Sequence, residues 1–150
     1  MTSLAETLAD ARALLAGDRA ALGTLDAEGW PYVSLVLVAQ DEGGLPLLLL
    51  SDLAEHTKNI GRETRVSLMF DGTARLAEPL AGPRFTLKGR IEPAPGPAAL
   101  ERYLKRHPAA EVWAGMRDFR LYRVRATGGH LVAGFGRIAS IDASTLFSRA

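Results

Sequence analysis

The sequence predicts one mainly β domain with inserted helices (α+β), in which antiparallel strands close into a small barrel. The chain has 150 residues, the length of a single domain covering 1–150, and its 47% hydrophobic and 23% charged residues are ordinary for a globular protein. Six or seven short segments have the alternation or the apolar character of strands, and glycine-rich or proline-rich turns separate them. Antiparallel strands in this number remove their unpaired edges by closing into a barrel.

The N-terminal third predicts a helix followed by a three-stranded meander. Ser3 and Glu6 have the spacing of a capping box, and apolar residues recur behind them at helical spacing, so we expect a helix over 4–16. Strands are expected at 20–25, 32–39 and 45–50, joined by tight turns at 26–29 and 41–44. The second of these strands is β-branched and apolar, which predicts burial on much of both of its faces.

The remaining elements alternate between strands and helices. Asp52 predicts the N-cap of a helix, with Glu55 as its capping partner. The expected elements after it are a helix at 53–61, a strand at 65–70, a loop at 71–83, a strand at 84–92, helices at 98–106 and 109–116, a hairpin of 119–126 and 130–136 about the turn 127–129, and a frayed end at 146–150. The strand at 84–92 alternates strictly, which gives it one apolar face and one basic face.

Composition excludes several classes of function. The chain has no cysteine, which excludes thiol catalysis and cysteine-ligated zinc, and no apolar run approaches the length of a membrane span. The N-terminal segment lacks the pattern of a signal peptide, so we expect a cytoplasmic protein without a membrane partner. Residues 1–83 carry 6 basic and 12 acidic residues, whereas 84–150 carry 12 basic and 5 acidic residues. The bases are scattered without a run, so no nucleic-acid partner is expected.

Motifs for common catalytic chemistries are missing from the sequence. There is no G-x-G-x-x-G, no P-loop and no G-x-S-x-G motif. The three histidines, His56, His107 and His130, are too widely spaced to support a metal site, and none is expected. No residue is assigned as a general acid or base.

The segment L-L-L-L-S-D-L-A-E-H-T-K-N at 47–59 is the most informative. A buried strand runs directly into a helix whose first turns carry His56, Thr57 and Lys58, and the open N–H groups of a helix start favour a phosphate. A plain capped helix with a solvated polar face explains the same residues equally well. Arg84 begins a second basic element, the alternating strand, which could face an anionic ligand or simply protect a sheet edge.

Five segments together resemble a known family. They are G-T-L-D-A-E-G-W-P-Y-V-S-L-V at 23–36, L-S-D-L-A-E-H-T-K-N at 50–59, R-V-S-L-M-F at 65–70, P-R-F-T-L-K-G at 83–89 and L-V-A-G-F-G-R at 131–137. The sequence resembles the pyridoxamine-phosphate-oxidase-like FMN-binding split barrels, and within them the N-terminal barrel of heme-utilisation proteins. The resemblance implies a six-stranded antiparallel split β-barrel and a homodimer with FMN at the subunit interface.

The resemblance also implies roles for individual residues. The cofactor-binding positions carried over are Ser34, Leu35, Val36, Ser51, His56, Thr57, Lys58 and Arg84. Among them, the first three would follow the flavin ring and the residues at 56–58 would hold its phosphate, more weakly than in pyridoxamine-phosphate oxidases because fewer charges are present. We therefore expect an FMN-dependent oxidoreductase of a small molecule. A non-catalytic heme- or flavin-binding sensor dimer is the alternative, and heme or a deazaflavin is the less favoured cofactor.

Overall fold

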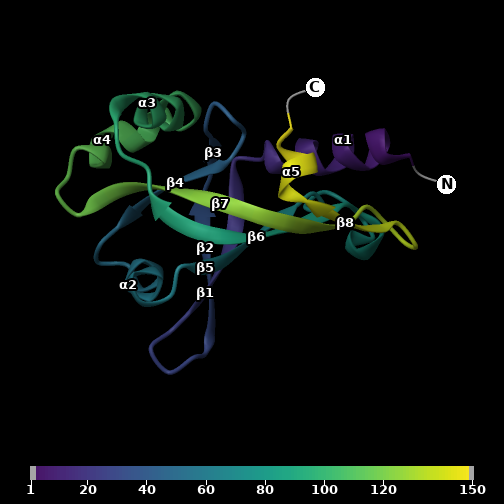
Figure 1. The fold of residues 1–150 in the computed structure, drawn as a ribbon, viewed down its shortest axis with the longest axis horizontal. Coiled ribbons are helices and arrows are strands. Elements are labelled where there is room, and N and C mark those ends of the chain that lie inside the picture. Colours follow the sequence, from purple (N-terminus) through teal and green to yellow (C-terminus); the bar gives the residue numbers. More distant parts are fainter. Residues whose placement is uncertain (1–2, 149–150) are drawn as a thin grey trace.

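A computed structural model describes residues 3–148, which form one curled antiparallel sheet with helices at its ends (Figure 1). The strands are β1 (Arg19–Leu25), β2 (Pro31–Leu37), β3 (Ala39–Gln40), β4 (Pro46–Ser51), β5 (Arg65–Asp71), β6 (Arg84–Pro93), β7 (Phe119–Val132) and β8 (Ile138–Asp142). The helical segments are α1 (Leu4–Leu15), α2 (Glu55–Arg62), η1 (Pro79–Ala81), α3 (Pro97–Arg106), η2 (Pro108–Ala110), α4 (Glu111–Ala114) and α5 (Ala143–Leu146). The fold class is therefore confirmed as mainly β with inserted helices.

The sheet is curled so that its two edges come close together, because a single residue joins the two edge strands. Its strand order is β2-β1-β5-β6-β7-β4-β3, with β8 added on β7, so β2 and β3 are consecutive in the chain but lie at opposite edges. The link between them is Val38, whose N–H donates to Asp18 O at 2.8 Å and whose carbonyl accepts from His107 Nε2 at 2.8 Å. The six strands expected are wrong in number, since the described residues form eight, and the expected meander is interrupted at Val38.

The core lies on the concave side of the sheet and follows the alternation of the strands. Phe85 and Leu87 of β6 are fully buried, together with Leu22 of β1, Leu68 and Phe70 of β5. A second, smaller cluster under α3 includes the buried residues Ala39, Leu47, Leu49, Ala99 and Tyr103. In Figure 1, α3 and α4 lie together at one end of the sheet, and α1 and α5 lie at the other. These four helices thus cover the ends of the curled sheet, while α2 packs against β1 and β2, and the outer-face residues Val33 and Leu35 of β2 stay exposed.

Local signals at the N-terminal helix and at the first turn are confirmed. Ser3 caps α1, since Ser3 Oγ accepts a hydrogen bond from Glu6 N at 3.1 Å. The turn between β1 and β2 closes on Asp26, whose Oδ1 accepts from Trp30 N at 2.8 Å. Gly29 takes a φ of 85° in this turn, a conformation that costs glycine little.

The hairpin expected about residues 127–129 is wrong. β7 continues through this segment, with Thr127 as an extra residue opposite β6, and the chain turns between β7 and β8 instead. Gly129 is explained by packing, because a Cβ there would lie 2.1 Å from Phe85 Cζ. The real turn contains Gly134 and Gly136, whose φ angles are 142° and 75°. Glycines of both kinds look alike in a sequence, and only the pairing of β7 with its neighbours separates them.

Four smaller expectations also need correction. The helix α2 is not capped by Asp52; its N-cap is Ala54, which has no side-chain acceptor. The strand β2 is not buried on both faces, since Val33 and Leu35 are 69% and 72% exposed. Beyond β6, the helix expected at 109–116 is a 3-10 turn followed by the short α4. In the same part of the chain, the frayed end expected at 146–150 is wrong at its start, because Leu146 ends α5 and is buried; residues 149–150 lie outside the described part.

The helices described here are short. Among residues 3–148, no helix combines the length and the apolar character that crossing a membrane requires.

Candidate functional site

The strand β2 and the helix α2 meet at one hydrogen bond between two residues named by the sequence. Ser34 Oγ lies 2.9 Å from His56 Nδ1, although 22 positions separate them. Ser34 is half-buried on β2, and His56 lies in the first turn of α2. Burial lowers the pKa of His56 below its ordinary value of 6.5, because desolvation penalises the imidazolium. The site therefore presents a neutral imidazole near physiological pH.

The start of α2 offers several unused hydrogen-bond donors. Its N-cap residue, Ala54, supplies no side-chain acceptor, and its carbonyl accepts from the N–H groups of Thr57 and Lys58, so the N–H groups of Glu55 and His56 are the ones open to another partner. Thr57 is only 8% exposed, and its Oγ1 is buried without a hydrogen-bond partner among the described residues. Lys58 is exposed, and its ammonium has no hydrogen-bond or ion-pair partner in the part of the chain described here. An anion placed here would satisfy groups that the protein itself leaves unpaired.

A buried polar link fixes α2 against the β1–β2 hairpin. Asn59 is fully buried, and its Nδ2 donates to Thr24 Oγ1 at 3.0 Å. Its Oδ1 accepts from Arg62 Nη2 at 2.9 Å, which leaves the amide well satisfied. The sequence analysis missed Asn59 as a positioning residue. A buried amide in a helix is detectable only once its apolar neighbours are known.

The other two residues expected on β2 point in opposite directions. Val36 is buried, whereas Leu35 stands on the outer face, where it pairs across the sheet with Ala21. Ala21 in turn pairs with Met69 of β5, and Val33 lies beside this row. These residues give the outer face an exposed apolar surface next to the Ser34–His56 pair. Apolar surface of this kind is often a binding surface.

Ser51 lies in the turn before α2 but its hydroxyl is already engaged, and Arg84 lies on a different strand. Ser51 Oγ donates to Asp118 Oδ2 at 2.7 Å and accepts from Leu53 N at 3.1 Å, so it stabilises the turn before α2. Arg84 begins β6, which β1 and β5 separate from β2. Its Nη1 donates to the carbonyls of Leu80 and Gly82 at 2.9 and 3.2 Å.

The remaining histidines have structural partners. His107 ends α3 and donates to the Val38 carbonyl, as described above. His130 Nδ1 lies 3.2 Å from Ser140 Oγ on the neighbouring strand β8. In the described part of the chain, no three histidine, aspartate or glutamate side chains gather as a metal site would require.

Comparison with known proteins identifies related sequences. A family profile described as "CREG, beta-barrel" matches residues 5–148. The chain is 34% identical over 110 residues to the chloroplastic non-canonical heme oxygenase HOZ of Arabidopsis thaliana, and the match covers 71% of this chain and 33% of that protein. The chain therefore spans about a third of the length of this curated relative.

Solved structures share the fold over nearly the whole chain. A heme binding protein from Mycobacterium smegmatis is 30% identical with a TM-score of 0.88, and the match covers 97% of this chain and 60% of that one. A Clostridium acetobutylicum protein of the pyridoxinephosphate oxidase family, related to general stress protein 26 of B. subtilis, has a TM-score of 0.72. It is 14% identical, with 95% of this chain and 98% of that one covered, so this likeness concerns the fold alone.

Proposed function

This chain belongs to the CREG beta-barrel family, and on that premise we propose that it is an FMN-binding protein whose flavin site lies at the Ser34–His56 pair. The observation that carries the proposal is the unpartnered Thr57 Oγ1 beside the uncapped start of α2. A buried hydroxyl without a partner costs about 1–3 kcal/mol, so its presence calls for an explanation. A bound phosphate supplies one.

The phosphate of FMN fits the donors at this helix start. The N–H groups of Glu55 and His56 and the ammonium of Lys58 could approach the same anion, and the Thr57 hydroxyl lies in the same turn of α2. Hydrogen bonds to a charged group contribute about 1.5–3 kcal/mol each. Only one of these donors carries a full charge, so we expect FMN to bind reversibly rather than to remain permanently attached.

The flavin ring would follow β2 at Ser34, Leu35 and Val36. Leu35 is largely exposed in the single chain, and a planar apolar ring placed against it would remove that surface from water. The proposal includes a homodimer, in which a second copy covers the outer face of β2. Arg84 lies three strands from β2 in its own copy, so it could contact flavin only across such an interface.

A bound flavin supplies hydride or electron transfer, and the protein would bind and orient it. On this basis the protein is proposed to be an FMN-dependent oxidoreductase of a small molecule. The neutral His56 would hold Ser34 in place through its Nδ1 and keep a second positive charge away from the ring. No catalytic residue is assigned.

Comparing FMN with riboflavin tests the phosphate site directly. Wild-type protein should bind FMN more tightly than riboflavin, and Lys58→Ala should weaken FMN binding by about tenfold while leaving riboflavin binding unchanged. The matched control is Lys105→Ala, which removes an exposed lysine from α3. Flavin fluorescence quenching measures the affinity of each of the three proteins for both flavins. Equal affinity for both flavins, or equal effects of the two substitutions, would exclude a phosphate site at α2.

Heme is the second candidate ligand, and one specific observation favours it. His56 uses only Nδ1 among the described residues, so its neutral imidazole has a free Nε2 that could ligate iron. Two relatives that share at least 30% identity with this chain are described as a heme oxygenase and a heme binding protein. Titration of the wild-type protein with hemin should then give a Soret band, and the band should shift in His56→Ala. A non-catalytic sensor dimer would bind the heme without degrading it. Binding of FMN but not hemin would reject this candidate.

A further inference from the structure

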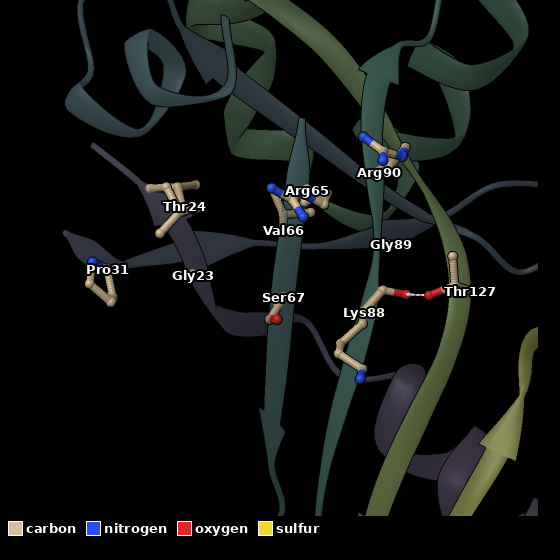
Figure 2. A pocket seen from close by; sticks show the side chains of 11 residues that line it. Gly23, Thr24, Pro31, Arg65, Val66, Ser67, Lys88, Gly89, Arg90 and Thr127 are labelled. Atoms are coloured by element: carbon tan, nitrogen blue, oxygen red, sulfur yellow. Dashed lines mark hydrogen bonds between the residues drawn. The ribbon is translucent and has the colours of Figure 1, made fainter. Parts of the chain in front are cut away.

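A second concave site lies on the outer face of the sheet, and the flavin proposal does not use it. It is a hollow of about 560 Å³ between β1, β5, β6 and the bulge of β7. Figure 2 shows Arg65 and Ser67 on β5 beside Lys88 and Arg90 on the neighbouring strand β6, and all four line the hollow. Its lining includes none of the residues at the Ser34–His56 pair or in α2. The volume is in the range of small-molecule sites.

Small residues create this hollow. Gly23 and Ser67 face each other across β1 and β5, and neither has a side chain long enough to fill the sheet surface between the flanking residues. On the other side, Thr127 is the extra residue of a bulge, and its Oγ1 donates to Lys88 O at 3.2 Å. The bulge brings β7 so close to β6 that only glycine fits at Gly89, because a Cβ there would lie 2.3 Å from Arg125 O.

Three arginines form a row across the strands beside the hollow. Arg65 of β5 is directly opposite Arg90 of β6, and Arg90 is directly opposite Arg125 of β7. Like charges placed opposite one another destabilise a sheet. A row of this kind therefore needs a compensating anion, either in the chain or from outside.

Among the described residues, only the two outer arginines of the row have ion-pair partners. Arg65 forms an ion pair with Glu63, and Arg125 forms one with Glu92. Arg90 between them donates to Thr64 Oγ1 at 3.2 Å and pairs with no carboxylate among residues 3–148. Lys88 has no hydrogen-bond or ion-pair partner for its ammonium in the same set. Arg90 is close enough to Glu63 to help Arg65 lower the pKa of that carboxyl, but neither Arg90 nor Lys88 has an ion-pair partner among the described residues.

We propose that this hollow binds a phosphoryl group, either inorganic phosphate or the phosphate of a small phosphomonoester. A phosphomonoester carries close to two negative charges at neutral pH, which matches the charges of Lys88 and Arg90, the two cations at the hollow without an ion-pair partner among the described residues. A guanidinium is suited to bidentate contact with phosphate oxygens, and the hydroxyl of Ser67 can supply a further donor. The site is independent of the flavin proposal, since it shares no residue with it.

Two-dimensional NMR of amide groups in the full chain tests the assignment. Titration with inorganic phosphate, and separately with glycerol phosphate, should shift the amides of Gly23, Ser67 and Thr127 in a saturable way. Arg90→Gln and Lys88→Gln should each weaken binding by about tenfold. The controls are Arg117→Gln and Lys105→Gln, which neutralise exposed cations outside the hollow. Saturation by glycerol phosphate alone would identify a phosphomonoester as the ligand, and saturation by both would identify the phosphoryl group itself.

Other outcomes would overturn the proposal. One is the absence of any amide shift at millimolar phosphate. Another is an equal loss of phosphate affinity in Arg90→Gln and Arg117→Gln, which would show that phosphate responds to overall positive charge and not to a defined site. Loss of phosphate binding in Lys58→Ala but not in Arg90→Gln would assign the phosphate to α2 and support only the flavin proposal. Retardation of duplex DNA at low salt that depends on Arg90 would assign the row to a nucleic acid instead.

Discussion

The side chains of Ser34 and His56 join the edge strand β2 to the helix α2 by a 2.9 Å contact between Oγ and Nδ1. This contact places the start of α2 beside the outer edge of the sheet. It also buries the imidazole of His56 enough to lower its pKa. The geometry of the candidate site depends on this pair more than on any other.

The stability of the protein should depend on the protonation of His56. Its pKa is lowered in the folded state, so the unfolded chain takes up the proton first as the pH falls. Stability is therefore fully present above the ordinary value of 6.5 and decreases as the pH falls below it. Urea denaturation at pH values above and below 6.5 should show that the free energy of unfolding decreases as the pH falls. The decrease should be smaller in His56→Gln, which has no imidazole to protonate. An NMR titration in which His56 protonates at or above 6.5 would contradict the prediction.

Thr57→Val should stabilise the protein without ligand and weaken its binding of FMN. Valine has nearly the shape of threonine but no hydroxyl, so the substitution removes a buried group that has no partner. We expect the free energy of unfolding to rise by about 1 kcal/mol. Chemical denaturation measures this free energy. The control is Thr7→Val on α1, because the Thr7 hydroxyl is not a buried group without a hydrogen-bond partner. A loss of stability would show that the hydroxyl has a partner in solution.

Leu35→Asp should convert a dimer into a folded monomer. Leu35 is 72% exposed in the single chain, so a charge there costs the fold little but disrupts an apolar interface. Val112→Asp, at a position that is 74% exposed on α4, is the matched control and should leave the dimer intact. Sedimentation analysis together with circular dichroism separates dissociation from unfolding. A wild-type protein that is monomeric at all concentrations would refute the dimer.

Two glycine substitutions should have opposite effects on stability. Gly89→Ala places a Cβ 2.3 Å from the backbone oxygen of Arg125, and we expect it to destabilise the fold by at least about 1–3 kcal/mol. Gly61 lies in α2 with nothing within 4 Å of a Cβ, so Gly61→Ala should stabilise the protein by about 0.5–1 kcal/mol. Thermal unfolding of both variants checks the pair. Similar effects of the two would mean that the bulge at Thr127 adjusts to the added methyl group.

The sequence by itself determined the features that depend on neighbouring residues. The cap of α1 at Ser3, the turn at Asp26 and the alternating faces of β6 are local patterns, and the structure has all three. The segment containing His56, Thr57 and Lys58 was also identified as a helix start directly after a strand. Local backbone preferences and side-chain periodicity are sufficient for such features.

Only the tertiary structure decided how distant segments pair. Gly129 could mark a turn or a close contact, and the ring of Phe85 against it makes it a close contact. The opposition of Arg65 and Arg90 depends on the register of β5 against β6, which no local pattern specifies. The same holds for the Ser34–His56 contact, because burial and register arise from packing between segments that are far apart in the chain.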